Sequence, residues 1–141
     1  MVSGAVASAL CTVVVSLGAR GVGRRPARGT NATSHWVWGD AAADQDPASV
    51  RYTAVGYLIH HASSVFWATF YERWLLSRIP LSRRPAIAAA AMAGVAYTVD
   101  YKVVPRRLTP GFEFHLSRPS ILGAYAAFAA GLFLVAATRR R

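Results

Sequence analysis

Long apolar segments separated by short basic ones dominate the pattern of this chain. The apolar segments cover about 2–19, 53–76, 85–104 and 119–138. A helix that crosses the hydrocarbon core of a bilayer needs roughly 20 mostly apolar residues. The second and fourth segments meet this length directly, and the first and third meet it with help from flanking residues or a thinner membrane. The pattern therefore predicts an all-α fold, an integral membrane four-helix bundle in which 1–141 forms a single transmembrane domain.

The first apolar segment could instead be a secretory signal peptide. Such a signal begins with a positively charged region, and the stretch from Met1 to Ala19 contains no basic residue. Four arginines follow within 20–28, in the position of a stop-transfer flank. We therefore expect this segment to be retained as a helix. Its cleavage would leave a bundle of three helices.

The chain is strongly basic, with 16 Lys and Arg against 6 Asp and Glu and a net charge of +10. Basic stripes can bind nucleic acid, but here the basic residues flank the apolar segments. Membrane proteins carry such residues where the chain meets lipid headgroups. We expect the lipid bilayer as the partner, with a homo-oligomer or a larger membrane complex as further options, and no nucleic acid. Both sides of a four-helix topology would be basic, so charge does not fix the orientation.

Small residues recur at every fourth position on the predicted helices. Close helix packing in membranes uses such faces, because small side chains let two backbones approach. The pattern predicts a tight bundle, with more weight on the first and last helices, since alanine-rich helices form such stripes by chance. The stripes are Gly4, Ser8, Thr12 and Ser16; Ala86, Ala90, Gly94 and Thr98; and Gly123, Ala127 and Gly131.

Two adjacent histidines, His60 and His61, lie in the middle of the second apolar segment, which carries no formal charge before Glu72. Ionisable side chains at bilayer depth are costly, so they indicate a functional site. One interpretation is a hydrogen bond from an imidazole to a serine, a threonine or a carbonyl of a neighbouring helix. The alternatives are a metal or haem ligand, since imidazole is the commonest metal-binding side chain, or a proton relay.

A metal site at the histidine pair would need further ligands. His60 and Glu72 are about 18 Å apart along a helix, so they cannot share one ion. The sequence contains neither HExxH nor CxxC. We therefore expect no cofactor, with haem or a metal ion as the alternative. Asp100 is a candidate partner of either histidine, and the wider candidate polar network comprises His35, Asp40, Ser64, Glu72, Asp100, Glu113 and His115.

The two long connecting segments have different characters. The first contains His35, Trp36 and Trp38, which suit the membrane interface, followed by a polar stretch at 40–49 that suits a solvated turn. The third, 101–120, alternates basic, apolar and turn residues. We interpret it as a surface anchor, with a lid over a site as the alternative. The lone Cys11 lies in an apolar helix where a thiol is inert, and the sequence favours a protein without enzymatic activity.

Three stretches carry a distinctive pattern: NATSHWVWGD at 31–40, HHASSVFWATFYE at 60–72 and VPRRLTPGFEFHLS at 104–117. Together they resemble a group of small, uncharacterised bacterial inner-membrane proteins over about 31–120. The resemblance implies a multi-pass location in the bacterial cytoplasmic membrane and brings no known activity. We expect a structural, accessory or interaction protein. The alternative is a membrane protein that uses His60 and His61 to bind a metal or haem or to relay protons.

Overall fold

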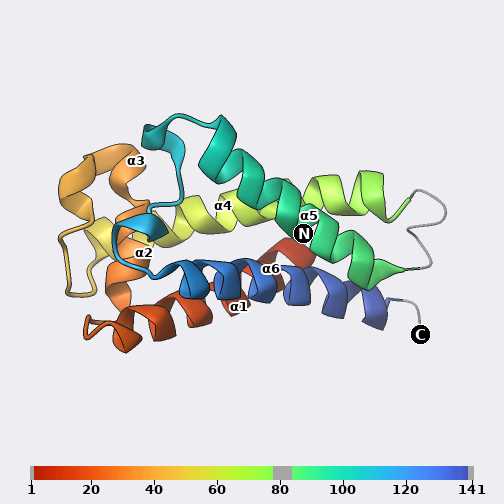
Figure 1. Cartoon of the computed structure of the whole chain (residues 1–141), viewed down its shortest axis with the longest axis horizontal. Helices are drawn as coiled ribbons and strands as arrows, with labels where there is room; N and C mark the ends of the chain where they lie inside the picture. Colours follow the sequence, from red (N-terminus) through yellow and green to blue (C-terminus); the bar gives the residue numbers. More distant parts are fainter. Residues whose placement is uncertain (1, 78–83, 140–141) are drawn as a thin grey trace.

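The computed structural model describes residues 2–77 and 84–139, and in these residues the prediction of an all-α fold is confirmed. The described residues form six α-helices joined by short 3-10 and π-helical turns, with no β-strand. Four long helices lie side by side, and two short ones gather at one end of the molecule (Figure 1). The long helices are α1 (Val2–Gly21), α4 (Val55–Phe70), α5 (Pro85–Thr98) and α6 (Arg118–Thr138), and the short ones are α2 (Ala27–Thr33) and α3 (His35–Trp38).

The helical backbone of the two middle segments extends beyond α4 and α5. Two π-helical turns, η2 (Val50–Ala54) and η3 (Tyr71–Leu75), flank α4, and a third, η5 (Val99–Val103), follows α5. Continuous helix therefore covers 50–75 and 85–103, close to the predicted 53–76 and 85–104. The boundaries follow ordinary capping chemistry: Pro85 lies in the first turn of α5, and the Ser117 hydroxyl accepts from the Ser120 N–H at the start of α6.

Helix α1 packs on both α6 and α4 and runs antiparallel to each. A Cβ on Gly131 would lie 2.4 Å from Cα of Ala7, and a Cβ on Gly4 would lie 2.7 Å from Cα of Val65. Both glycines are therefore positions of close backbone approach, as the small-residue stripes of the first and last helices predict. Helix α5 packs on α6 instead.

The predicted small-residue stripe of α5 is wrong. Ala86, Ala90, Gly94 and Thr98 are exposed, and a Cβ on Gly94 would meet nothing within 4 Å. The buried face lies on nearly the opposite side of the helix, and the larger Met92 packs into the core there. That face consists of Ala88, Ala89, Met92, Ala93 and Ala96.

The connecting segments fold into a cap over one end of the bundle, formed by residues 27–47 and 105–116. It contains α2, α3 and the 3-10 turns η1 (Asp40–Ala42), η6 (Arg106–Leu108) and η7 (Phe112–Phe114). Asn31 is fully buried at its centre and donates to the carbonyls of Gln45 at 2.7 Å and Pro47 at 3.0 Å. The stretch expected as a solvated turn is thus partly packed. The third connecting segment packs onto the first, since His35 and Trp36 both bond to the Thr109 carbonyl.

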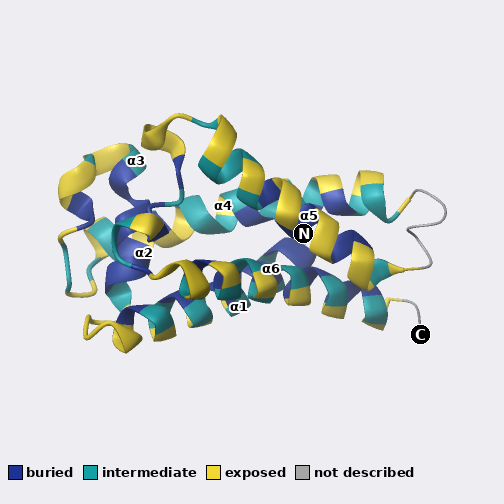
Figure 2. Ribbon diagram, viewed as in Figure 1, coloured by how far each residue is buried: buried dark blue, intermediate teal, exposed yellow. Residues whose placement is uncertain are grey.

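The outer faces of the long helices are apolar. Exposed residues lie along the flanks of all these helices (Figure 2), and many are large hydrophobic side chains. Within the described residues, α1 and α6 are the two helices long and apolar enough to cross a membrane by length and composition. The exposed large side chains on the helices include Val13 and Leu17 on α1, Leu58 and Phe66 on α4, Ile87 and Val95 on α5, and Leu122 and Leu134 on α6.

Candidate functional site

The histidine pair on α4 faces α1, and both imidazoles reach the same residue there, Ser8. Nδ1 of His61 lies 2.9 Å from the Ser8 hydroxyl, in a hydrogen bond. The Nε2–H of His60 donates to the Ser8 carbonyl at 3.3 Å, and the Thr12 hydroxyl donates to the same oxygen at 2.8 Å. The pair therefore forms interhelical hydrogen bonds, the first of the interpretations that the sequence allowed.

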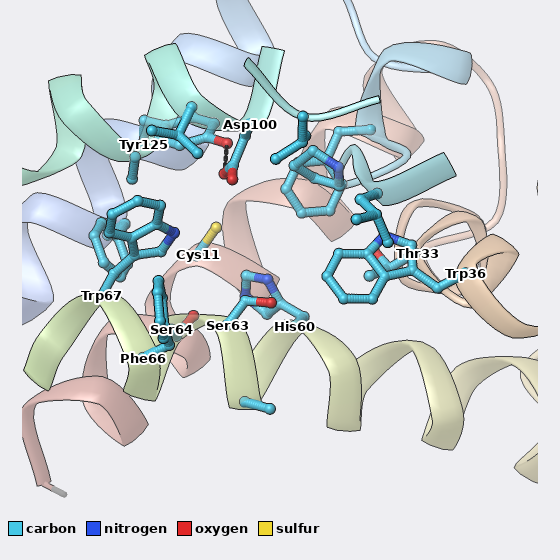
Figure 3. A pocket seen from close by; sticks show the side chains of 18 residues that line it. Cys11, Thr33, Trp36, His60, Ser63, Ser64, Phe66, Trp67, Asp100 and Tyr125 are labelled. Atoms are coloured by element: carbon cyan, nitrogen blue, oxygen red, sulfur yellow. Dashed lines mark hydrogen bonds between the residues drawn. The ribbon is translucent and has the colours of Figure 1, made fainter. Parts of the chain in front are cut away.

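His60 also lines a cavity of about 510 Å³ between the long helices and the cap. Figure 3 shows the side chains that surround this space, with Trp67 and His60 on one side and Asp100 and Tyr125 on another. Its wall is mainly apolar and rich in aromatic rings: Trp36, Phe66, Trp67, Phe112, Tyr125 and Phe128. A smaller polar set contributes Cys11, Thr33, His60, Ser63, Ser64 and Asp100. Chain segments from both ends of the sequence thus build one site.

Asp100 lies in η5, directly after α5, on the wall of this cavity, and its partner is Tyr125. The Tyr125 hydroxyl donates to Oδ2 of Asp100 at 2.5 Å. Among the described residues, the hydrogen bonds of Asp100 and of the two histidines go to different partners, so the expected pair between Asp100 and His60 or His61 is not formed. The partner of this carboxylate is a phenol instead.

Thr33 is the unusual polar residue of the cavity wall. Its side chain is buried, with 3% of the residue exposed, yet within 2–77 and 84–139 its hydroxyl has no hydrogen-bond partner. A buried hydroxyl without a partner costs about 1–3 kcal/mol. Thr33 is one of the residues that line the cavity at the cap end.

His35 is fully buried in the cap and has a structural role. Its Nε2–H donates to the Thr109 carbonyl at 2.9 Å, and the indole N–H of Trp36 donates to the same oxygen at 2.8 Å. Asp40, at the surface, lies 4.0 Å from Nδ1 of His35 and 3.5 Å from the Arg106 guanidinium. Together these contacts fasten the first connecting segment to the third.

Two other candidate residues also belong to the cap. The Thr109 hydroxyl donates to the Glu113 carboxylate, and the Nε2–H of His115 donates to the Ala43 carbonyl at 2.6 Å. Partial burial lowers the pKa of His115, since it penalises the charged imidazole, although the bond to Ala43 acts in the opposite direction. These residues hold the cap in shape and do not face the cavity.

The cap also contains an ionic contact that the sequence did not indicate. Arg28, which is buried, lies 2.9 Å from an oxygen of Asp46 and 3.4 Å from an oxygen of Asp44. The hydrogen bond from Arg28 lowers the pKa of Asp46. A buried guanidinium of this kind requires such partners, because an unpaired charge out of water is very costly.

Glu72 lies at the end of the bundle opposite the cap. It accepts a hydrogen bond from the Ser3 hydroxyl and pairs with Arg139 at 3.1 Å. The candidate polar network is therefore divided into three places: the cap with His35, Asp40, Glu113 and His115, the cavity with Ser64 and Asp100, and the far end with Glu72. In the part of the chain that the structure describes, no group of three His, Cys, Asp or Glu residues could hold a metal ion.

Thr33 and Tyr125 contribute to the cavity although neither stands out in the sequence. Trp67 could have been found, since it lies seven residues after His60 and so on the same helix face. Tyr125 is an isolated aromatic residue in an alanine-rich helix, and Thr33 lies in a segment that gives no sign of facing inward. No protein-family model, curated protein or solved structure matches the chain, so the function rests on this geometry.

Proposed function

We propose that the protein is a multi-pass membrane protein with four spanning helices. Helices α1 and α6 have 20 and 21 residues, and a helix of that length covers about 30 Å, the thickness of a bilayer core. The continuous helix at 50–75 reaches the same length, and the one at 85–103 nearly does. No Asp, Glu, Lys or Arg occurs in 55–70 or 85–98. These features support four spans, two of which are extended by π-helical turns.

The distribution of charge supports the same arrangement. The flanks of the helices expose large apolar side chains, and the basic residues gather at the two ends of the bundle, where lipid headgroups would lie. We assign the protein to the bacterial cytoplasmic membrane on the sequence resemblance given above, with the bilayer as its first partner. Association with a further copy or a larger membrane complex belongs to the same proposal.

The activity we propose is binding of a small lipid-soluble molecule, in an accessory role and without catalysis. The observation that carries it is the cavity of about 510 Å³ with the unpartnered Thr33 hydroxyl on its wall. Ligand sites are typically apolar cavities of about 300–1,000 Å³ with a few polar groups that orient the ligand. The titratable groups of the cavity, His60 and Asp100, already have protein partners, which favours binding over proton transfer.

Binding of a metal or haem by His60 and His61 is the second candidate. It is favoured by one observation, the position of His60 on the cavity wall. The bonds of both imidazoles to Ser8 oppose it, because a ligand to iron or zinc would have to leave the serine. A Soret band or stoichiometric metal in the purified protein, lost in a His60→Ala, His61→Ala double variant, would establish this candidate over the first.

The proposed function is tested by isolating the protein from membranes in mild detergent and identifying small molecules extracted from it by mass spectrometry. We expect an apolar molecule in the wild-type protein and its loss in Ser63→Phe, which fills the cavity. Ala126→Phe places the same side chain at an exposed position of α6 and should retain the molecule. Equal content in both variants would contradict the binding role, and release of the protein by alkaline carbonate would contradict the membrane location.

A further inference from the structure

We propose that the cavity takes a lipid-soluble molecule with a ring-shaped head group and a hydrogen-bond-accepting oxygen, of the quinone class, which enters sideways from the bilayer between α4 and α5. The inference rests on the proposed function and names its ligand class and route. It follows from the position of the cavity mouth, the rings on the wall and the buried hydroxyl of Thr33, which has no partner among the described residues.

The cavity opens on the flank of the bundle. Ala62 and Phe66 of α4 line it and are exposed, Phe66 to 53%. Val99 and Val104, which follow α5, line the opposite side and are partly exposed. The cap covers the end of the space, and α5 packs on α6 rather than along α4. A ligand dissolved in the bilayer can therefore reach the cavity between α4 and α5 without crossing water.

The wall selects a ring over a plain acyl chain. Trp36 and Phe112 come from the cap, Trp67 from α4 and Tyr125 and Phe128 from α6, so rings surround the space on several sides (Figure 3). Aromatic pairs in offset or edge-to-face contact gain about 0.5–1.5 kcal/mol beyond the burial of their area. An acyl chain gains only the burial, and it would fit equally well on an aliphatic wall.

The polar groups of the wall favour a ligand that carries an oxygen able to accept a hydrogen bond. Tyr125 already donates to Asp100, and the Nε2–H of His60 already donates to Ser8. The Thr33 hydroxyl is buried and without a partner among the described residues, so its proton is available to a carbonyl or ether oxygen of the ligand. No lysine or arginine occurs among the described residues that line the cavity, which disfavours a phosphate-bearing lipid head.

The ligand class is tested with ubiquinone-1, a short-tailed quinone, added to the detergent-purified full chain. Two of its tryptophans, Trp36 and Trp67, line the cavity, and the other two, Trp38 and Trp74, are exposed. We expect saturable quenching of tryptophan fluorescence, and the same quenching in a Trp38→Phe, Trp74→Phe variant. Calorimetry on the wild-type protein gives an independent dissociation constant.

Two variants test the hydrogen bond from Thr33 and the route between α4 and α5 separately. Thr33→Val keeps the shape of the side chain and removes the hydroxyl, so we expect binding weakened about threefold to tenfold. The stability of the unliganded variant should be unchanged or higher, because the lost hydroxyl had no partner. Ala62→Trp obstructs the mouth and should slow or abolish binding, whereas Ala126→Trp, the same change at an exposed position of α6, should bind as the wild type does.

The experiments test four statements separately: the ligand class, the contact to Thr33, the lateral route and the proposed function. If ubiquinone-1 does not bind but another small molecule is extracted from the purified protein, the ligand class is overturned and the proposed function stands. Unchanged affinity in Thr33→Val overturns the polar contact, and equal behaviour of Ala62→Trp and Ala126→Trp overturns the lateral route. If the wild-type protein contains no small molecule and binds no quinone, the proposed function fails together with the inference.

Discussion

At the scale of single residues, Ser8 is the point where two helices are joined. Its hydroxyl is bonded to His61, and its carbonyl accepts from His60 and Thr12. The sequence could predict that the histidines face the bundle, because the polar residues of their helix share one side. It could not predict their partner, since a serine within a small-residue stripe has no mark that separates it from its neighbours.

Replacing Ser8 with alanine should destabilise the bundle by about 1 kcal/mol, because one interhelical hydrogen bond is lost while the backbone contact to His60 remains. Reversible unfolding in mixed micelles with increasing SDS measures the change. Ser16→Ala, on the same stripe about two turns nearer the cap, is the matched control and should cost less. Equal losses in the two variants would show that the bond to His61 contributes nothing.

The stability of the cap should depend on pH through His115. Burial lowers the pKa of this imidazole, with the Arg28 charge acting in the same direction and Asp44 opposing it. A lowered pKa in the folded state means that the unfolded chain binds the proton more readily. Stability is therefore complete above the unfolded pKa of about 6.5 and falls as the pH decreases below it.

The measurement for His115 is the thermal midpoint at pH 7.5 and pH 5. We expect a decrease in the wild-type protein and a smaller one in His115→Gln, whose side-chain amide can still donate to the Ala43 carbonyl without titrating. The difference between the two proteins isolates His115 from the other histidines. An identical decrease in both would assign the pH dependence elsewhere.

At the scale of elements, the long helices were predictable and the cap was not. Each long helix follows from a local apolar run, with a proline or serine near its start. The cap depends on contacts between distant segments, such as the bond from Trp36 to Thr109 across 73 residues, and such pairings leave no local pattern. The stripe on α5 shows the same limit, because spacing alone did not reveal which alanine face meets α6.

The close contact between α1 and α6 should tolerate no added carbon. Gly131→Ala places a Cβ 2.4 Å from Cα of Ala7, and we expect a loss of about 1–3 kcal/mol as the helices separate. Gly94→Ala makes the same change where nothing lies within 4 Å and should be neutral or slightly stabilising. Unfolding in mixed micelles compares the two, and equal effects would contradict the packing described.

At the scale of the whole molecule, the cavity exists only because all the long helices and the cap contribute to it. The sequence predicted the all-α class of the fold. It also indicated three candidate residues that line the cavity: His60, Ser64 and Asp100. It could not predict the cavity, because its volume depends on how α4 and α5 are placed relative to each other. Nor could it find Thr33, whose importance comes from the absence of a partner among the described residues.

The four spans that we propose would place the cap and the end of η3 on opposite sides of the membrane. In a Cys11→Ala background, Ala48→Cys near the cap and Ser77→Cys beyond η3 both provide exposed thiols. A membrane-impermeant maleimide added to intact cells should label one of them and not the other, until the cells are opened. Labelling of both thiols in intact cells would contradict the proposal that the cap and the end of η3 lie on opposite sides of the membrane.

The bonds of His35 and Trp36 to Thr109 have a consequence for biosynthesis. Their acceptor is made 73 to 74 residues later, after most of the chain has left the ribosome. Until residues 105–116 have been made, the buried polar side chains of α2 and α3 lack their cover and the pocket has no end wall. A nascent chain that stops before residue 105 would already contain the histidine clamp between α1 and α4. The pocket is therefore complete only after both the cap and α6, which contributes Tyr125 and Phe128 to its wall, have been made.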